Sequence, residues 1–418
     1  MVRDDEARPG HTRRDWMKYG GALVAGGLLT GCTGGDSEST PTGAAAEATT
    51  GEPVTATPAD AAAETTAEST ESGSYEACLS PAGCVEFAEP PGSVLTILPH
   101  HADMATAAGH GDAVDAMLYN PGYNGTIWSK FLERLPGVSV EWADLPGEWN
   151  PSKEFLYELD ADLHLDDPAY MTTMDAWTAG DITEVTENVG PWFGNTFSNA
   201  NKQPPGEWAE GYEYYTLWEI FERVAQVFRA EERYTALKRV HDEMLSTVES
   251  NLPSEDERPS VAMIILSQAE DSMWVYALNG PGFLTAHTRP LGATDVFADV
   301  ETESTVGYEG LLEADPDVIL CLAGMSDQRH VSKTRERFED DPTAQSVSAV
   351  EDERIYTQGG RNQGPLMNLF QTEMAAKQLY PEQFGEWPTY TEGPYPEIPP
   401  EEQLFDRERV ADIVTGAT

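Results

Sequence analysis

Basic residues are scarce in this sequence. Of its 418 residues, 25 are Lys or Arg and 73 are Asp or Glu, so the formal net charge is −48. So few cations cannot neutralise the phosphates of a nucleic acid, which excludes DNA and RNA as partners. An acidic excess spread along the chain is typical of halophilic proteins, whose surface carboxylates keep them soluble while molar salt screens their repulsion. We therefore expect the folded state to depend on high salt.

Sequence motifs for calcium binding and for catalysis are also missing. The sequence has no EF-hand loop and no Asp-rich nonapeptide repeat, which argues against calcium binding. It also lacks G-x-S-x-G, H-E-x-x-H, C-x-x-C, a phosphate-binding loop and a dinucleotide fingerprint. These absences exclude only the enzyme families that use such motifs. We predict that the protein is not an enzyme and uses no cofactor, with a tethered surface hydrolase as an alternative.

Cysteine is rare, with four residues in the whole chain. Cys321 lies inside the apolar run DVILCLAG, where a buried and unreactive thiol is expected. Cys78 and Cys84 are separated by a segment that contains Pro and Gly, so they could close a small disulfide loop outside the membrane, where thiols oxidise. A metal site made from these two cysteines alone is less expected.

The apolar run at residues 19–31 is too short to span a bilayer, which needs about 20 residues. It follows the pair Arg13 and Arg14, and this order predicts a secretory signal for the twin-arginine (Tat) route. The sequence Leu-Thr-Gly-Cys at 29–32 resembles the lipobox of bacterial and archaeal lipoproteins, in which the cysteine carries the lipid. We therefore predict a haloarchaeal type of lipoprotein, anchored through Cys32 on the extracellular face of the cell membrane.

Composition and apolar patterning divide the chain into six segments. A Thr-, Ala- and Glu-rich stretch with few large apolar residues cannot offset its ordering entropy and is expected to be disordered. The Pro- and Glu-rich end of the chain is expected to be loosely packed. The predicted segments are a signal at 1–32, a tether at 33–74, an α/β lobe at 75–211, a helical connector at 212–252, a second α/β lobe at 253–390 and an acidic tail at 391–418.

Short apolar runs suited to strands occur on both sides of the connector. In its second helical stretch, residues 231–252, apolar side chains recur at helical spacing until Pro253 stops the helix. An amphipathic helix is expected at 369–380. The predicted strands lie at 93–98, 137–142 and 161–165 before the connector and at 260–266, 317–324 and 354–360 after it.

Two similar segments occur in the sequence, EFLYELDADLHL at 154–165 and EGLLEADPDVIL at 309–320. We call this pair of segments the doubled phrase. Each copy predicts the end of a helix, an Asp-x-Asp corner and a short buried strand. The copies lie too far apart for a solenoid repeat, whose period is about 20 to 50 residues. They predict two similar lobes, although helix-corner-strand junctions can also resemble one another by coincidence.

Several linked stretches point to a known family. LGATDVFADV, YEGLLEADPDVIL, AVEDERIYT and LYPEQF follow one another between residues 291 and 384. In this order, and with the long helix before them, they resemble the substrate-binding proteins of ABC transporters for ferric siderophores and cobalamin. The resemblance covers roughly residues 92–385. It implies an α/β fold of two similar lobes joined by a long rigid helix, with the ligand cleft between the lobes.

The resemblance also implies partners. A receptor of this family captures a ferric siderophore or a cobalamin-like ligand and delivers it to an ABC permease, which an ATPase drives. A glutamate on the outer face of each lobe meets arginines of the permease. Glu154 and Glu309, the first residues of the doubled phrase, occupy the matching places, although ordinary solvated glutamates near a helix start would look the same.

Ligand-binding residues are expected on loops beyond the carboxyl ends of strands in both lobes. Arg presents a fixed fork to carboxylate or carbonyl oxygens, and Tyr and Trp cover apolar faces. A lone aromatic is otherwise packing, and a surface Arg otherwise pairs with a carboxylate. The predicted ligand-binding residues are Tyr119, Tyr123, Trp274, Arg329, Arg361 and His100.

A histidine pair gives an alternative ligand class. His100 and His101 follow the first predicted strand, where zinc- and manganese-binding relatives of this architecture place a histidine. Imidazole is a common metal ligand, but a site needs three or four converging ligands. No such set can be assembled from the sequence, so no metal site is predicted. A receptor for a divalent metal or for haem stays the alternative.

Overall fold

The computed structural model describes residues 73–267 and 271–417. The predicted signal, nearly all of the predicted tether and Cys32 lie outside these residues. No helix in the described part is long and apolar enough to cross a membrane.

A parallel sheet of three strands forms the centre of the first lobe, in the order β4-β3-β5. Its strands are short and mostly buried, as expected when helices cover both faces of a parallel sheet. Because the strands are parallel, the segments that follow them all leave the sheet at one edge. The elements are β3 (Val94–Thr96), α2 (Pro99–Ala107), β4 (Val114–Met117), α3 (Pro121–Leu132), α4 (Lys153–Leu159), β5 (Leu163–His164), α5 (Pro168–Met171) and α6 (Ala179–Asn188).

Two details of the first lobe differ from the sequence prediction. The strand expected at 137–142 is wrong, since this segment has no strand and ends in a 3₁₀ turn at Trp142–Asp144. Trp142 is buried against Trp128, so its apolar residues pack without joining the sheet. The loop expected after the first strand is also wrong, because Pro99 begins helix α2, where proline is favourable.

A hairpin precedes the first sheet. Strands β1 (Tyr75–Leu79) and β2 (Gly83–Phe87) pair antiparallel, and Cys78 faces Cys84 across the ladder. The two cysteines form a disulfide with a Cα separation of 4.0 Å. The inner side of the hairpin packs on helix α7 through buried Ala77 and Leu79.

Two helices join the lobes. Helix α7 (Leu217–Val227) contacts β1 and α2 of the first lobe. Helix α8 (Glu231–Asn251) has 21 residues, about 30 Å at 1.5 Å per residue, and contacts α7 as well as a 3₁₀ turn of the second lobe, Arg289–Leu291. The long helix predicted at 231–252 is thus present.

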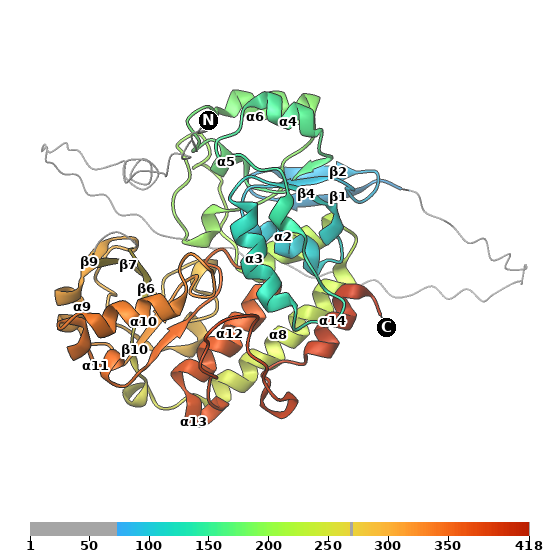
Figure 1. The fold of residues 1–418 in the computed structure, drawn as a ribbon. Coiled ribbons are helices and arrows are strands. Elements are labelled where there is room, and N and C mark those ends of the chain that lie inside the picture. Colours follow the sequence, from blue (N-terminus) through green and yellow to red (C-terminus); the bar gives the residue numbers. More distant parts are fainter. Residues whose placement is uncertain (1–72, 268–270, 418) are drawn as a thin grey trace, which may run out of the picture. The chain divides into compact units, whose positions relative to one another are not determined.

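A sheet of six strands forms the centre of the second lobe (Figure 1). Its order is β11-β10-β6-β7-β9, and β8 also pairs with β6. Strands β6, β10 and β11 run parallel, whereas β7 is antiparallel to β6 and β9. The elements are β6 (Ser260–Leu266), β7 (Ser272–Tyr276), β8 (Thr294–Asp295), β9 (Thr305–Gly307), α9 (Tyr308–Ala314), β10 (Val318–Cys321), α10 (Val331–Asp340), α11 (Ser348–Glu351) and β11 (Ile355–Thr357).

The doubled phrase folds into the same unit in both lobes. Helices α4 and α9 have seven residues each and end at a left-handed aspartate, Asp160 (φ 48°) and Asp315 (φ 38°). The second aspartate of each corner then binds the start of the lobe's first strand. Asp162 accepts hydrogen bonds from the N–H groups of Gly92 and Ser93, and Asp317 accepts them from the N–H and hydroxyl of Ser260. The fold is therefore the predicted α/β arrangement of two similar lobes.

Helix α12 (Pro365–Leu379) is buried along its whole length. Asp103 of α2 accepts hydrogen bonds from the N–H groups of Leu366 (3.1 Å) and Met367 (3.0 Å), a favourable place for a carboxylate at a helix start. A Cβ at Gly364 would lie 2.4 Å from the Asp103 Cβ, so glycine permits this approach. The prediction of an amphipathic helix is wrong, because α2, α3, α7 and α13 (Pro381–Phe384) surround α12.

The end of the chain packs on the body. Tyr395 is fully buried, and its N–H donates to the Lys130 carbonyl (2.7 Å). Arg407 lies 2.5 Å from the buried carboxylate of Glu373, and α14 (Arg407–Thr415) contacts α8. The prediction of a loosely packed tail is wrong, because the apolar and aromatic residues between the Pro and Glu residues are the buried ones.

Candidate ligand-binding site

Three half-buried tyrosines of the first lobe lie beyond the carboxyl ends of its strands. Tyr119 follows β4, and its N–H donates to the Ile97 carbonyl after β3 (3.0 Å). Tyr123 lies in the first turn of α3, where its N–H donates to the capping side chain of Asn120 (3.4 Å). Tyr170 lies in α5, which follows β5. The three tyrosines thus come from two strand ends of one parallel sheet.

Strand β7 of the second lobe contributes two aromatic rings, each beneath an arginine. Trp274 and Tyr276 are two positions apart and therefore point to the same side of the sheet. The guanidinium carbon of Arg329 lies 5.8 Å from the centre of the Trp274 ring, and that of Arg361 lies 4.6 Å from the Tyr276 ring. Arg329 follows β10 and Arg361 follows β11. Cation–π attraction stabilises both arrangements.

The charges of these arginines act on the tyrosines of the first lobe. Burial raises the pKa of the Tyr119 hydroxyl, while the charges of Arg329 and Arg361 act to lower it. Burial likewise raises the pKa of Tyr170, and Arg361 again opposes this shift. We call this set the interlobe cluster, and it consists of Tyr119, Tyr123, Tyr170, Trp274, Tyr276, Arg329 and Arg361.

The electrostatics of the interlobe cluster favour hydrogen-bond donation. Burial raises the pKa of Tyr123, while Ser326 and the charge of Arg329 act to lower it. Burial also raises the pKa of Tyr276 to about 12, although Arg361 acts to lower it. The tyrosines are therefore neutral at pH 7 and can donate hydrogen bonds. With two arginines beside them, they offer donors and positive charge to an oxygen-rich ligand.

A carboxylate also reaches the interlobe cluster. Glu303 forms an ion pair with Arg361, and its other oxygen lies 3.7 Å from the Lys202 ammonium. Burial acts to raise the pKa of Glu303, but Arg361 and Lys202 outweigh it, so the pKa is lowered. The sequence prediction missed Glu303 and Lys202. One glutamate among 73 acidic residues carries no signal of its own in the sequence.

The structure brings five of the six predicted ligand-binding residues into the interlobe cluster. The sixth, His100, has no exposed surface. Its ring packs on His101 (3.9 Å between centroids) and on Phe283 of the second lobe (5.0 Å). Burial is the main reason that its pKa lies well below the usual value, so the imidazole is neutral. The ligand-binding role of all six residues remains a prediction.

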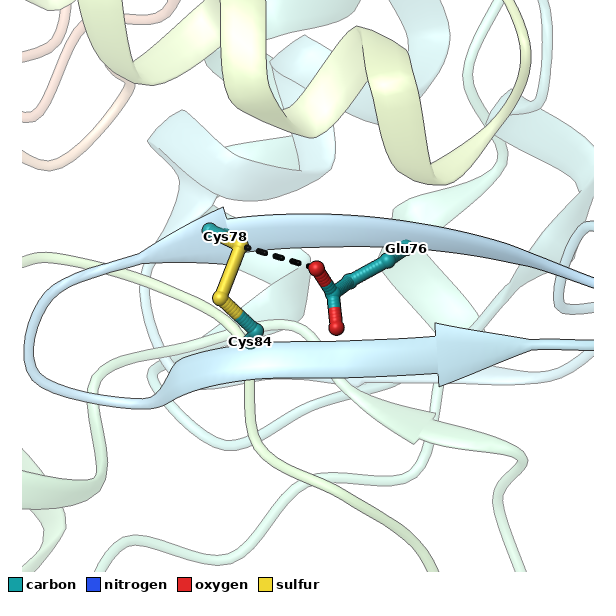
Figure 2. Close-up of side chains that lie close together, drawn as sticks. All are labelled: Glu76, Cys78 and Cys84. Carbon is teal, nitrogen blue, oxygen red and sulfur yellow. Dashed lines mark hydrogen bonds between the residues drawn. A yellow bond between two sulfur atoms is a disulfide. The ribbon is translucent and has the colours of Figure 1, made fainter.

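Metal-ligating side chains converge at one place in the described residues. Glu76, Cys78 and Cys84 lie together on the hairpin β1-β2 (Figure 2). The sulfur atoms of Cys78 and Cys84 form a disulfide bond. The Cys78 sulfur lies 3.8 Å from a carboxylate oxygen of Glu76. A disulfide offers no thiolate for a metal ion. His100 and His101 do not belong to a convergent set of this kind within the described ranges.

The two predicted docking glutamates occupy equivalent positions. Glu154 lies in the first turn of α4 and Glu309 in the first turn of α9, and both side chains are exposed. Negative charge is favourable at either helix start, so local stability alone also explains both residues. Their role in docking stays a prediction, and Cys32 lies outside the described residues.

Comparisons with known proteins agree with this architecture. The periplasmic binding protein family matches residues 192–361 of the chain. A periplasmic binding protein from Veillonella parvula DSM 2008 is 14% identical, covers 74% of this chain and 92% of its own, and has a TM-score of 0.52. A petrobactin-binding protein from Bacillus subtilis is 12% identical and covers 74% of this chain and 99% of its own, with a TM-score of 0.51.

A third solved structure is similar to the same extent. It is an iron-uptake ABC transporter substrate-binding protein from Streptococcus pneumoniae, 14% identical, covering 74% of this chain and 99% of its own, with a TM-score of 0.50. No curated protein matches the sequence. At these identities the likeness shows the fold, two α/β lobes of the kind found in solute-binding proteins, and leaves the ligand to be tested.

Proposed function

We propose that this protein is the substrate-binding receptor of an ABC importer and that it captures a ferric siderophore or a cobalamin-like ligand. The observation that carries the proposal is the interlobe cluster. Two arginines lie over the aromatic rings of β7, and their charges act on the hydroxyl of Tyr119 in the other lobe. The iron-uptake and petrobactin-binding proteins of similar fold support an iron chelate as the ligand.

The chemistry of the interlobe cluster fits a ferric chelate better than a small metabolite. A siderophore presents carboxylate, catecholate or hydroxamate oxygens around iron and an organic periphery with apolar faces. Arginine binds such oxygens with two parallel donors, and neutral tyrosines add single hydrogen bonds. Trp274 and Tyr276 supply flat surfaces for the periphery. Binding and release complete this task, and no covalent step is needed.

The location and partners of the receptor belong to the same proposal. The twin-arginine signal and the lipidated Cys32 would place the protein on the extracellular face of the membrane. Glu154 and Glu309, one on each lobe, would meet the permease, whose ATPase powers transport. The exposure of both glutamates and their equivalence in the doubled unit support this assignment.

The proposal is tested by fluorescence titration of residues 33–418 in molar salt. The ligands are an anionic and a neutral ferric siderophore, cobalamin, haem, Zn²⁺ and Mn²⁺. We expect saturable quenching of Trp274 by a ferric siderophore or cobalamin, and its loss in Trp274→Phe. Arg361→Ala and Arg329→Ala should each weaken binding at least tenfold, since a charged hydrogen bond contributes about 1.5 to 3 kcal/mol.

Arg239→Ala is the matched control, because Arg239 is an exposed arginine on α8 outside the interlobe cluster. Its affinity should equal that of the unchanged protein. Binding of Zn²⁺ or Mn²⁺ that is lost on changing His100 and His101 would contradict the proposal in favour of a metal receptor. Binding of haem alone would identify the protein as a haem receptor. If no ligand binds, the result would favour the alternative that the protein is a tethered surface hydrolase.

A further inference from the structure

We infer that Glu303 is a specificity-determining residue, which acts as a built-in counter-anion of Arg361 and selects ligands by their charge. The inference rests on the proposed function, and it identifies net charge as the ligand property that the site distinguishes. In this arrangement a ligand anion must displace the Glu303 carboxylate from Arg361 in order to bind. Strongly anionic chelates are therefore disfavoured relative to neutral ones.

The contacts of Glu303 place it at the point where the two lobes face each other. One carboxylate oxygen pairs with Arg361, which follows β11 of the second lobe, and the other lies 3.7 Å from Lys202, which belongs to the first lobe. The guanidinium carbon of Arg361 at the same time lies over the Tyr276 ring, 4.6 Å from its centre. The guanidinium thus has an aromatic face below it and a carboxylate at its edge, which is where a ligand anion would bind.

The turn that carries Glu303 is held against strand β7. Glu303 has a left-handed backbone (φ 70°), uncommon for a residue with a side chain. Its N–H donates to the Val275 carbonyl (2.7 Å), and the Val275 N–H donates to the Ser304 carbonyl (3.0 Å). The Ala277 N–H donates to the Thr302 hydroxyl (3.2 Å). These bonds fix the carboxylate beside the same strand that presents Trp274 and Tyr276, so its position is built into the sheet.

The charges of the site then predict its selectivity. Arg329 and Arg361 provide two positive charges in the interlobe cluster, and Glu303 neutralises one of them. Removing the carboxylate leaves Arg361 free to pair with the ligand and also removes a repulsion between Glu303 and ligand anions. Both effects favour anionic ligands and leave a neutral ligand almost unchanged, because a neutral ligand has no net charge for the carboxylate to repel.

The experiment compares Glu303→Gln with the unchanged protein, using a tricatecholate ferric chelate, which is strongly anionic, a neutral trihydroxamate and a cationic trihydroxamate with a pendant amine. All titrations use one salt concentration, at which the melting temperatures of the proteins agree. We expect Glu303→Gln to bind the anionic chelate up to about fivefold more tightly, since an exposed ion pair contributes up to about 1 kcal/mol. Its affinity for the neutral chelate should stay within about twofold, and that for the cationic chelate should fall.

Glu301→Gln is the matched control, since it removes one exposed carboxylate from the same turn. An equal gain in Glu301→Gln would show a general effect of protein charge and overturn the inference. Equal affinities of Glu303→Gln and the unchanged protein, or a uniform loss for all three chelates, would also overturn it while leaving the proposed function intact. If the unchanged protein binds none of the chelates, the ferric-siderophore form of the proposed function fails and the inference fails with it.

Discussion

Asp166 shows how a single buried carboxylate organises the first lobe. It accepts hydrogen bonds from the N–H groups of Ile97 (3.0 Å) and Leu98 (3.2 Å), directly before helix α2. The Thr196 hydroxyl donates to its other oxygen (2.8 Å), and the His101 Nδ1 lies 3.2 Å away. Burial acts to raise the pKa of Asp166, but the charge and hydrogen bond of His101 outweigh it and lower the pKa to about 2.

This lowered pKa predicts acid sensitivity. A carboxyl group with a lower pKa in the folded state stabilises the fold above its unfolded pKa, and the contribution is lost as the pH falls through the folded value. For Asp166 the window runs from 3.8 down to about 2, and the contribution is roughly 2 kcal/mol. Denaturant unfolding at pH 4 and pH 2 should show this loss in the unchanged protein and not in Asp166→Asn.

The pH range from 4 to 2 suits this measurement, because the neighbouring buried carboxyl groups titrate at a higher pH. Burial raises the pKa of Asp103 and of Asp167 to about 6. Asp175→Asn, a change at an exposed position, is the control and should keep the pH dependence of the unchanged protein. The same loss of stability in Asp166→Asn as in the unchanged protein would contradict the assignment.

At the residue scale, the sequence predicts the positions of the half-buried side chains of the candidate site better than the surroundings of the fully buried ones. Tyr119, Arg329 and Arg361 follow strands, and arginines in such loops stand out in so acidic a chain. Trp274 is expected on a loop, but it lies within strand β7. The surroundings of His100 depend on Phe283, which is distant in sequence. Spacing along the chain contains no signal for such a contact.

At the element scale, the doubled helix-corner-strand unit is the most informative part of the sequence. Both copies end their helix at a left-handed aspartate and bind the first strand of their lobe through a second aspartate. The unit is local, so its pattern can be read from neighbouring residues. Helices α2 and α12 instead meet through Asp103 and Gly364, more than 260 residues apart. Their burial therefore could not be predicted from periodicity.

The doubled unit also gives a test of docking. In cells that depend on this importer, Glu154→Ala combined with Glu309→Ala should abolish uptake while ligand affinity measured by titration stays unchanged. The physical reason is that two exposed carboxylates, one on each lobe, would lose their arginine partners on the permease. Uptake of labelled ligand and affinity are measured on the same pair of proteins.

The same unit supplies the control for this experiment. Glu158 and Glu313 are also equivalent and exposed, and they lie further along the same helices. Glu158→Ala combined with Glu313→Ala removes the same charge and should leave uptake near normal. Normal transport by the Glu154 and Glu309 double variant would refute docking through these residues, and equal loss in both double variants would assign the effect to overall charge.

At the scale of the whole molecule, charge is the dominant property. The chain carries a formal net charge of −48, yet the interlobe cluster gathers two arginines with one carboxylate beside them. Negative charge outside the site repels an anionic ligand at a distance, and screening by salt removes that repulsion beyond about 3 Å at 1 M. On the halophilic interpretation, we therefore expect high salt to support both the folded state and the approach of an anionic ligand, whereas short contacts inside the interlobe cluster should persist.

The resulting prediction concerns stability as a function of salt. The melting temperature should fall steadily as NaCl is lowered from molar to millimolar concentration, because repulsion among unscreened carboxylates destabilises the compact state more than the unfolded chain. Circular dichroism melting over a series of NaCl concentrations measures this effect. Sucrose of equal osmolality in low salt is the control and should restore stability less than NaCl, since an uncharged solute does not screen charge. A melting temperature that is the same in low and molar salt would show that the acidic surface has been accommodated by other means, and would remove the halophilic interpretation of the composition.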